Sequence, residues 1–241
     1  MLAYIFVLAV ALVAGCLSGV IGTGSSIMLL PVLVFAYGPK EAVPIMAVAA
    51  VMSNVSRVAL WWRELNWRAF LAYSIPGVPA AALGARTLLA LPTHVIEGAL
   101  GVFFLLMVPA RYQLVRLNIR IRLWQLAVAG ALIGFLTGLV LSTGPLSVPA
   151  FTAYGLLKGS FLATEAASSL ALYTSKVFAF RELGALPMTS IVKGLIVGSS
   201  LMVGAIAGKA VVLRMSPGRF HLILDALMIV SGASMLWDAF R

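Results

Sequence analysis

Ten long apolar segments take up most of this sequence. Five precede a basic stretch at 111–122 and five follow it. Their bounds are 2–21, 25–36, 42–62, 69–91, 95–110, 124–141, 146–157, 161–180, 188–213 and 220–237. Since one bilayer crossing takes about 20 apolar residues, the chain has room for roughly eight to ten crossings and for little besides short turns. The pattern predicts an all-α protein that crosses a membrane many times.

Composition supports a lipid-facing surface. Hydrophobic residues make up 62% of the chain and charged residues 10%, against about 25% charged residues in ordinary soluble domains. So few polar side chains cannot cover a soluble globule of this size. We therefore predict a multi-pass membrane protein.

The net charge of +10 fits membrane orientation better than nucleic-acid binding. The 17 Lys and Arg residues are scattered over loops and helix ends, whereas nucleic-acid binding gathers such residues on one surface. Cytoplasmic loops of membrane proteins carry excess Lys and Arg. Cys16 is the only cysteine, and the two histidines do not form an HExxH zinc motif. The sequence predicts no cofactor, no metal and no nucleic-acid partner.

The two halves of the chain resemble each other. The tripeptide Arg-Glu-Leu begins at Arg63 and again at Arg181, 118 residues later, and Pro31 and Pro149 are separated by the same interval. Internal repeats of this kind are common in membrane transporters. We predict a first transmembrane repeat at 1–110, a basic cytoplasmic linker at 111–123 and a second transmembrane repeat at 124–241.

The second segment of each half decides the topology. Each is short and contains a proline, which suits either a short crossing or a re-entrant helix. Two crossings give ten helices in inverted halves, and two re-entrant helices give eight helices in parallel halves. Ten crossings place nine of twelve loop cations on one face, against eight of twelve for the alternative. The positive-inside rule therefore slightly favours ten helices with both termini outside.

Two basic residues lie inside apolar segments at matching places of the two halves. Arg57 follows Ser53 and Asn54 by about one helical turn, and Lys176 follows Tyr173 and Thr174. An unpaired charge costs at least about 2.5 to 3.5 kcal/mol in a bilayer. A cation beside polar side chains in each half predicts one anion held between the halves. The alternative is snorkelling, in which each long side chain reaches the nearby interface.

Glycine-rich breaks precede the two prolines of the short segments. Freed backbone N–H groups and the N-terminus of the following helix can bind an anion at such a break. The alternative is close helix packing, to which we assign Gly15, Gly19, Gly130, Gly134 and Gly138. The break residues predicted to contribute to an anion site are Gly22, Gly24, Ser25, Ser26, Ser142, Thr143 and Gly144.

Three acidic residues inside apolar segments are weaker candidates, for proton coupling. Glu97 and Asp225 each follow a histidine by one turn in the last segment of their half, and Glu165 lies near the start of another segment. All three are near segment ends, where a charge costs little. Placement at the membrane interface is therefore the alternative to proton transfer.

A series of small-residue motifs runs along the chain: the glycine break before Pro31, the loop at 38–42, the helix ending in Arg63, Pro76-Gly77 and Gly84-Ala85-Arg86. In this order the motifs resemble the TauE/SafE sulfite exporter family. The resemblance covers nearly the whole chain and is clearer in the first half. It implies a carrier in the bacterial inner membrane for sulfite, sulfonates or related sulfur-containing anions. Such motifs identify an architecture better than they identify a substrate.

The residues and the resemblance together favour a secondary transporter that holds a small anion and catalyses no reaction. A passive channel could use the same cations, and saturable flux that depends on a proton gradient would argue against it. A membrane assembly factor is a third hypothesis, which transport by the purified protein alone would exclude. No Gly-x-Ser-x-Gly motif is present, which argues against an enzyme. Because apolar surfaces toward lipid and toward a second subunit look alike, the sequence leaves a homodimer open.

Overall fold

The computed structural model describes residues 2–21, 25–116, 120–140 and 144–212, with short stretches at 225–226, 229–230, 232–233 and 236–237. Every regular element in these residues is helical, which confirms the predicted all-α class. The elements are α1 (Leu2–Ile21), α2 (Ser25–Tyr37), α3 (Pro39–Trp61), the 3-10 helix η1 (Trp62–Glu64), α4 (Trp67–Ala90), α5 (Thr93–Arg116), α6 (Leu123–Val140), α7 (Gly144–Ala153), α8 (Lys158–Glu182) and α9 (Met188–Val212).

The apolar segments match these helices closely, with two informative differences. α7 ends at Ala153 and not at 157, because Gly155 takes a φ of 100° and its amide bonds the Thr152 carbonyl in a turn. α5 continues to Arg116, so residues 111–116 of the predicted linker are helical. No Gly or Pro follows Pro109 before Arg116 to stop the helix.

Local sequence accounts for several helix ends. Gly38 takes a φ of 75° between α2 and α3, and Pro39 opens α3, where a missing amide hydrogen costs nothing. The Asn66 side chain caps α4 by accepting a hydrogen bond from the Ala69 amide at 3.0 Å. α8 ends at Glu182 and is followed by Gly184 at a φ of 72°, and the next amide, of Ala185, donates to the Phe180 carbonyl at 2.9 Å.

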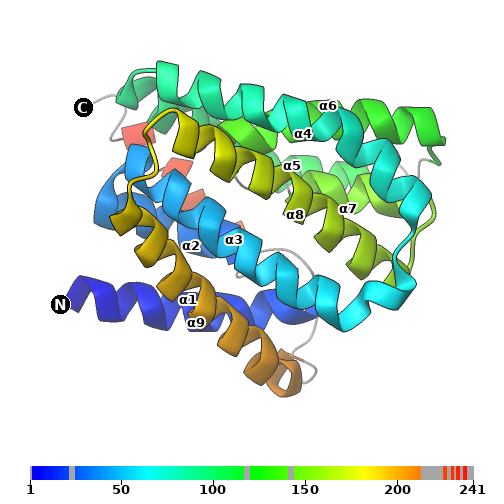
Figure 1. Cartoon of the computed structure of the whole chain (residues 1–241), viewed down its shortest axis with the longest axis horizontal. Helices are drawn as coiled ribbons and strands as arrows, with labels where there is room; N and C mark the ends of the chain where they lie inside the picture. The colour runs from blue at the N-terminus through cyan, green and yellow to red at the C-terminus, as the bar shows by residue number, and fades with distance from the viewer. Residues whose placement is uncertain are drawn as a thin grey trace.

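The main packing runs through six helices in the order α1, α9, α3, α8, α4 and α6 (Figure 1). Each helix of this series packs extensively on the next, and helices from the two halves of the chain alternate throughout the series. Residues 42–50 of α3 are buried throughout, which makes α3 the central helix of the larger apolar core. α2 packs against α1 and α3.

Glycines allow the closest helix contacts. A Cβ atom built on Gly130, Gly134 or Gly138 of α6 would overlap the backbone of α4, and one built on Gly15 of α1 would overlap the backbone of α9. Small residues permit this approach where membrane helices touch. The packing role predicted for these four glycines is confirmed. Gly19 lies outside the residues whose packing is described.

Helix length and hydropathy together identify one candidate membrane span. Among the described residues, Lys40–Glu64 is long and apolar enough, with a mean hydropathy of 1.6. Exposed tryptophans at helix ends, among them Trp62, Trp67 and Trp124, are typical of membrane interfaces. The predicted eight to ten crossings stay a prediction. Five shorter apolar helices lie at Phe6–Cys16, Met28–Tyr37, His94–Ala110, Leu123–Leu139 and Met188–Gly204.

Candidate functional site

A buried group of polar side chains lies where α3, α7 and α8 meet. We call it the Arg57 cluster and define it as Asn54 and Arg57 of α3, Ser147 of α7, and Glu165 and Ser169 of α8. Its members come from segments about 100 residues apart in the sequence. Two of them, Arg57 and Asn54, were predicted as anion-binding residues, and Glu165 was predicted as a weaker proton-coupling candidate.

The two terminal nitrogens of the Arg57 guanidinium donate to two different acceptors. Nη1 donates to the Glu165 carboxylate at 2.8 Å, and Nη2 donates to the side-chain oxygen of Asn54. Asn54 is held in turn by its own amide, which donates to the Ala50 carbonyl at 2.8 Å. Asn54 precedes Arg57 by three residues and hence shares its helix face. The planar guanidinium is therefore fixed by α3 on one side and by α8 on the other.

The Glu165 carboxylate has a hydrogen-bond donor from each of three helices. Besides Arg57, the Ser169 hydroxyl donates to Oε1 at 2.9 Å and the Ser147 hydroxyl lies 3.4 Å from the same oxygen. The side chains of Arg57 and Glu165 are 13% and 3% exposed. The protein therefore encloses most of both side chains, and the Arg57 guanidinium contacts Glu165 and Asn54.

Lys176 lies on the same face of α8 as Glu165, but far along the helix. Eleven residues separate the two, which is about three turns and about 16 Å of rise. The Lys176 side chain is fully buried, and its Nζ donates to the Thr137 carbonyl at 2.7 Å. Thr137 lies in the last turn of α6, where carbonyls lack intrahelical donors. In this conformation Lys176 caps α6 and does not reach the Arg57 cluster.

The remaining predicted residues of α8 divide between two other places. Tyr173 is buried in the larger apolar core with α3. Thr174 follows Glu165 by nine residues, which places it on the opposite face of α8. There it lines an open cavity of about 480 Å³ between α4 and α8. Ser53 is buried, and the structure records no hydrogen bond from its hydroxyl to the Arg57 cluster.

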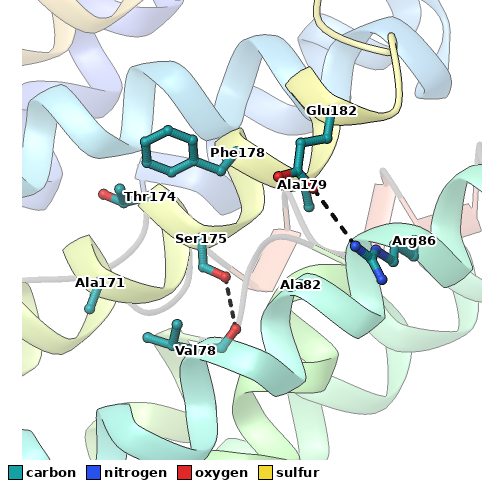
Figure 2. A pocket seen from close by; sticks show the side chains of 9 residues that line it. All are labelled: Val78, Ala82, Arg86, Ala171, Thr174, Ser175, Phe178, Ala179 and Glu182. Atoms are coloured by element: carbon teal, nitrogen blue, oxygen red, sulfur yellow. Dashed lines mark hydrogen bonds and ion pairs between the residues drawn. The ribbon is translucent and has the colours of Figure 1, made fainter.

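Figure 2 shows a charge pair among the residues that line the cavity between α4 and α8. Arg86 of α4 lies 3.7 Å from Glu182 of α8, and both side chains are more than half exposed. The Ser175 hydroxyl donates to the Val78 carbonyl at 2.8 Å. Because this cavity is exposed and its charges are mutually neutralised, we centre the candidate site on the Arg57 cluster instead.

Several predicted residues fall at the edge of the described structure or beyond it. Gly22, Gly24, Ser142 and Thr143 lie outside the described residues, while Ser25 and Ser26 open α2 and Gly144 opens α7. The position of Glu97 on α5 is described, but its side chain is not. Asp225 accepts a hydrogen bond from the Tyr112 hydroxyl at 2.5 Å. Asp225 thus has a partner on α5, away from the Arg57 cluster.

Sequence reasoning missed the pairing of Arg57 with Glu165 and the part played by Ser147 and Ser169. Arg57 and Glu165 are 108 residues apart, so no local spacing connects them. A charged residue inside an apolar segment does require a partner, and that signal applied to both. Within the part of the chain that the structure describes, no three His, Cys, Asp or Glu side chains gather as metal ligands.

The comparisons with known proteins identify one family. A family model described as "Sulfite exporter TauE/SafE" matches residues 7–235, nearly the whole chain. No curated protein matches the sequence, and no solved structure matches it either.

Proposed function

The chain belongs to the sulfite exporter TauE/SafE family, a family of membrane transporters, and from this membership we propose its specific activity. We propose a secondary transporter that exports a small sulfur-containing anion, such as sulfite or an organosulfonate. We place it in the bacterial inner membrane as a multi-pass protein. Transport requires no catalysed reaction, which agrees with the family.

One observation carries the proposed site: a buried guanidinium inside a transporter. A charge that is largely enclosed by protein is costly unless a group of opposite charge meets it. Arg57 is held in place by Asn54 and lies among buried hydroxyls that can donate to an anion. A planar guanidinium binds the oxygens of carboxylates and other oxyanions with two parallel hydrogen bonds. Arg57 is therefore the residue that we expect to bind the substrate.

The packing pattern supports two halves, at 1–110 and 124–241, that are related by a two-fold axis. The first helix of the first half, α1, packs on the fourth helix of the second half, α9. Reciprocally, the first helix of the second half, α6, packs on the fourth helix of the first half, α4. The third helices of the two halves, α3 and α8, pack on each other. This exchange is expected of a two-fold axis passing between α3 and α8.

Contacts between loops support ten crossings with the basic loops on the cytoplasmic face. The Ile121 amide donates to the Ala153 carbonyl at 3.0 Å, which joins the linker to the end of α7. The Asn66 amide donates to the Thr164 hydroxyl at 3.0 Å, which brings the loop after α3 to the start of α8. Three loops that carry the basic residues thus meet at one end of the molecule. The positive-inside rule places that end in the cytoplasm.

Transport by the purified protein tests the proposal against its alternatives. The full chain in liposomes should take up radiolabelled sulfite with saturable kinetics and respond to a proton gradient. Flux that rises linearly with concentration would favour a channel, and no flux for any sulfur anion would favour an assembly factor. A binding screen with sulfite, sulfate, thiosulfate, taurine, sulfoacetate and a carboxylate control identifies the preferred anion.

Two substitutions locate the site. Arg57→Gln should weaken anion binding by about 1.5 to 3 kcal/mol, the range for hydrogen bonds to charged groups. Arg68→Gln is the matched control, because Arg68 is exposed at the start of α4. Equal losses in the two variants, or none in either, would remove Arg57 from the site.

The same measurement in a detergent-purified dimer and monomer would show whether a homodimer is needed.

A further inference from the structure

We propose that Glu165 couples the transported anion to a proton by competing with the anion for Arg57. Without substrate, the carboxylate holds the guanidinium; a substrate anion takes its place only when Glu165 accepts a proton. This inference rests on the proposed transport of an anion through the Arg57 cluster. The sequence predicts Glu165 only as a weak candidate for proton coupling; its competition with the anion for Arg57 is the new element, and it comes from the ion pair.

The Glu165 carboxylate occupies the position beside Arg57 where we expect the transported anion to bind. Glu165 receives hydrogen bonds from Arg57 at 2.8 Å and from Ser169 at 2.9 Å, and the Ser147 hydroxyl lies 3.4 Å away. A sulfite or sulfonate oxygen would use the same donors. Ser147 lies in the first turn of α7, where the helix dipole also favours negative charge. One set of donors thus serves two anions that cannot both be bound.

Charge balance makes the exchange depend on a proton. With the ion pair intact, Arg57 and Glu165 together are neutral. An added anion beside an ionised Glu165 leaves a net negative charge in a buried site, and a protonated Glu165 without an anion leaves a net positive one. Either state is costly at low dielectric. The neutral alternatives are the ion pair itself, or bound anion with protonated Glu165.

Among the described side chains, Arg57 is the one cation in contact with Glu165. Among the described elements packed on α8, Arg57 of α3 and Tyr73 of α4 are the titratable groups that face it. Arg86 is engaged with Glu182 at the far end of α8. The carboxylate of Glu64 lies against Gly159 in the first turn of α8. On α8 itself, Lys176 is about three turns away, and Lys158 is about two turns away with a side chain outside the described residues.

The hydroxyl groups accommodate both forms of Glu165. Ser147 and Ser169 can donate to the carboxylate, and each can rotate to accept from a protonated carboxyl group. The protonation step moves one proton from the bulk solution to a carboxylate oxygen, and deprotonation returns it on the other side. One monovalent anion therefore travels with one proton in the same direction, and the cycle moves no net charge. In the export direction the proton leaves with the anion, so the concentration gradient of the anion must drive the cycle.

The test compares anion binding by wild type and Glu165→Gln across pH. The amide imitates a permanently protonated Glu165, so this variant should bind sulfite and isethionate at least as tightly as wild type, with the largest gain at high pH. Wild-type affinity, relative to the variant, should fall about tenfold per pH unit where Glu165 is ionised. Comparing the two proteins at each pH cancels the titration of sulfite itself, and isethionate does not titrate in this range.

Glu182→Gln is the matched control. It removes a carboxylate from the same helix, but from an exposed pair. We expect its pH dependence to follow wild type. A control that behaves like Glu165→Gln would show a general charge effect and overturn the proposal.

A second measurement needs no variant. When isethionate is added to weakly buffered wild-type protein, the protein should take up about one proton per anion bound, and a pH indicator measures this uptake. Anion binding without proton uptake would overturn the coupling role and leave the proposed transport intact. Loss of binding in a folded Glu165→Gln would do the same, because it makes Glu165 a supporting residue. Failure of wild type to bind either anion would overturn both proposals.

Discussion

At the residue scale, Arg57 and Glu165 make two buried charges depend on each other. Arg57→Gln leaves the carboxylate unpaired, and breaking one partner of a buried ion pair typically costs about 3 to 5 kcal/mol. The double substitution Arg57→Gln and Glu165→Gln removes both charges, so we expect it to recover part of that loss. Thermal unfolding of the detergent-solubilised variants measures this. A double variant less stable than Arg57→Gln alone would contradict the pairing.

The two in-segment cations provide a second residue-scale prediction. Lys176 lies about 16 Å along α8 from the partner of Arg57, and its Nζ is engaged with the Thr137 carbonyl. The free-energy effects of substitutions at sites more than about 10 Å apart usually add to within about 0.5 kcal/mol. In this conformation we therefore expect additive effects of Arg57→Gln and Lys176→Gln on anion binding. Coupling above that value in a double-mutant cycle would show that another conformation brings both cations to one anion, as the sequence predicts.

The sequence allowed half of the candidate site to be predicted. Arg57 and Asn54 could be found because Ser53, Asn54 and Arg57 lie on one helix face and form a local pattern. The partner, Glu165, could not be assigned to Arg57, because only the packing of α3 on α8 brings them together. Similarly, the repetition of a cation at Lys176 suggested a shared ligand, whereas the neighbouring end of α6 provides its acceptor.

At the element scale, the contact of α4 with α6 depends on the absence of side chains. A Cβ on Gly134 would overlap the backbone of Gly77, so Gly134→Ala must push the helices apart. Overpacking of this kind costs about 1 to 3 kcal/mol. We expect a lower unfolding temperature for Gly134→Ala than for Val128→Ile, which adds one methyl group at an exposed position of α6. Similar unfolding temperatures would mean that the contact between α4 and α6 is looser than described.

Helix positions could be predicted from hydropathy because every helix has an apolar run of its own. α1 has the same bounds, 2–21, by both routes. The prediction was less accurate where the signal depends on backbone geometry. The apolar run at 146–157 continues past the turn at Gly155, and only the φ of 100° there shows where α7 ends. The partners of each helix could not be predicted, because an apolar surface does not specify what covers it.

At the scale of the whole molecule, the joined basic loops predict one face for residues far apart in sequence. In a Cys16→Ala background, single cysteines replacing Arg120 and Leu157, which are both exposed, should resist an impermeant reagent applied to intact cells. Both should react after the membrane is opened. Labelling at Leu157 alone from outside would replace ten crossings with eight, because only then do these loops lie on opposite faces.

The alternation of helices from the two halves also determines when the protein can mature on the ribosome. Gly204 of α9 packs against Leu12 of α1, 192 residues earlier. At about 5 to 20 residues per second, α1 is synthesised about 10 to 40 s before its main partner exists. The glycine-bearing face of α1 is therefore exposed to lipid or to the insertion machinery during that interval. A newly made first half lacks the partners of both α1 and α4, so the two halves complete their fold together.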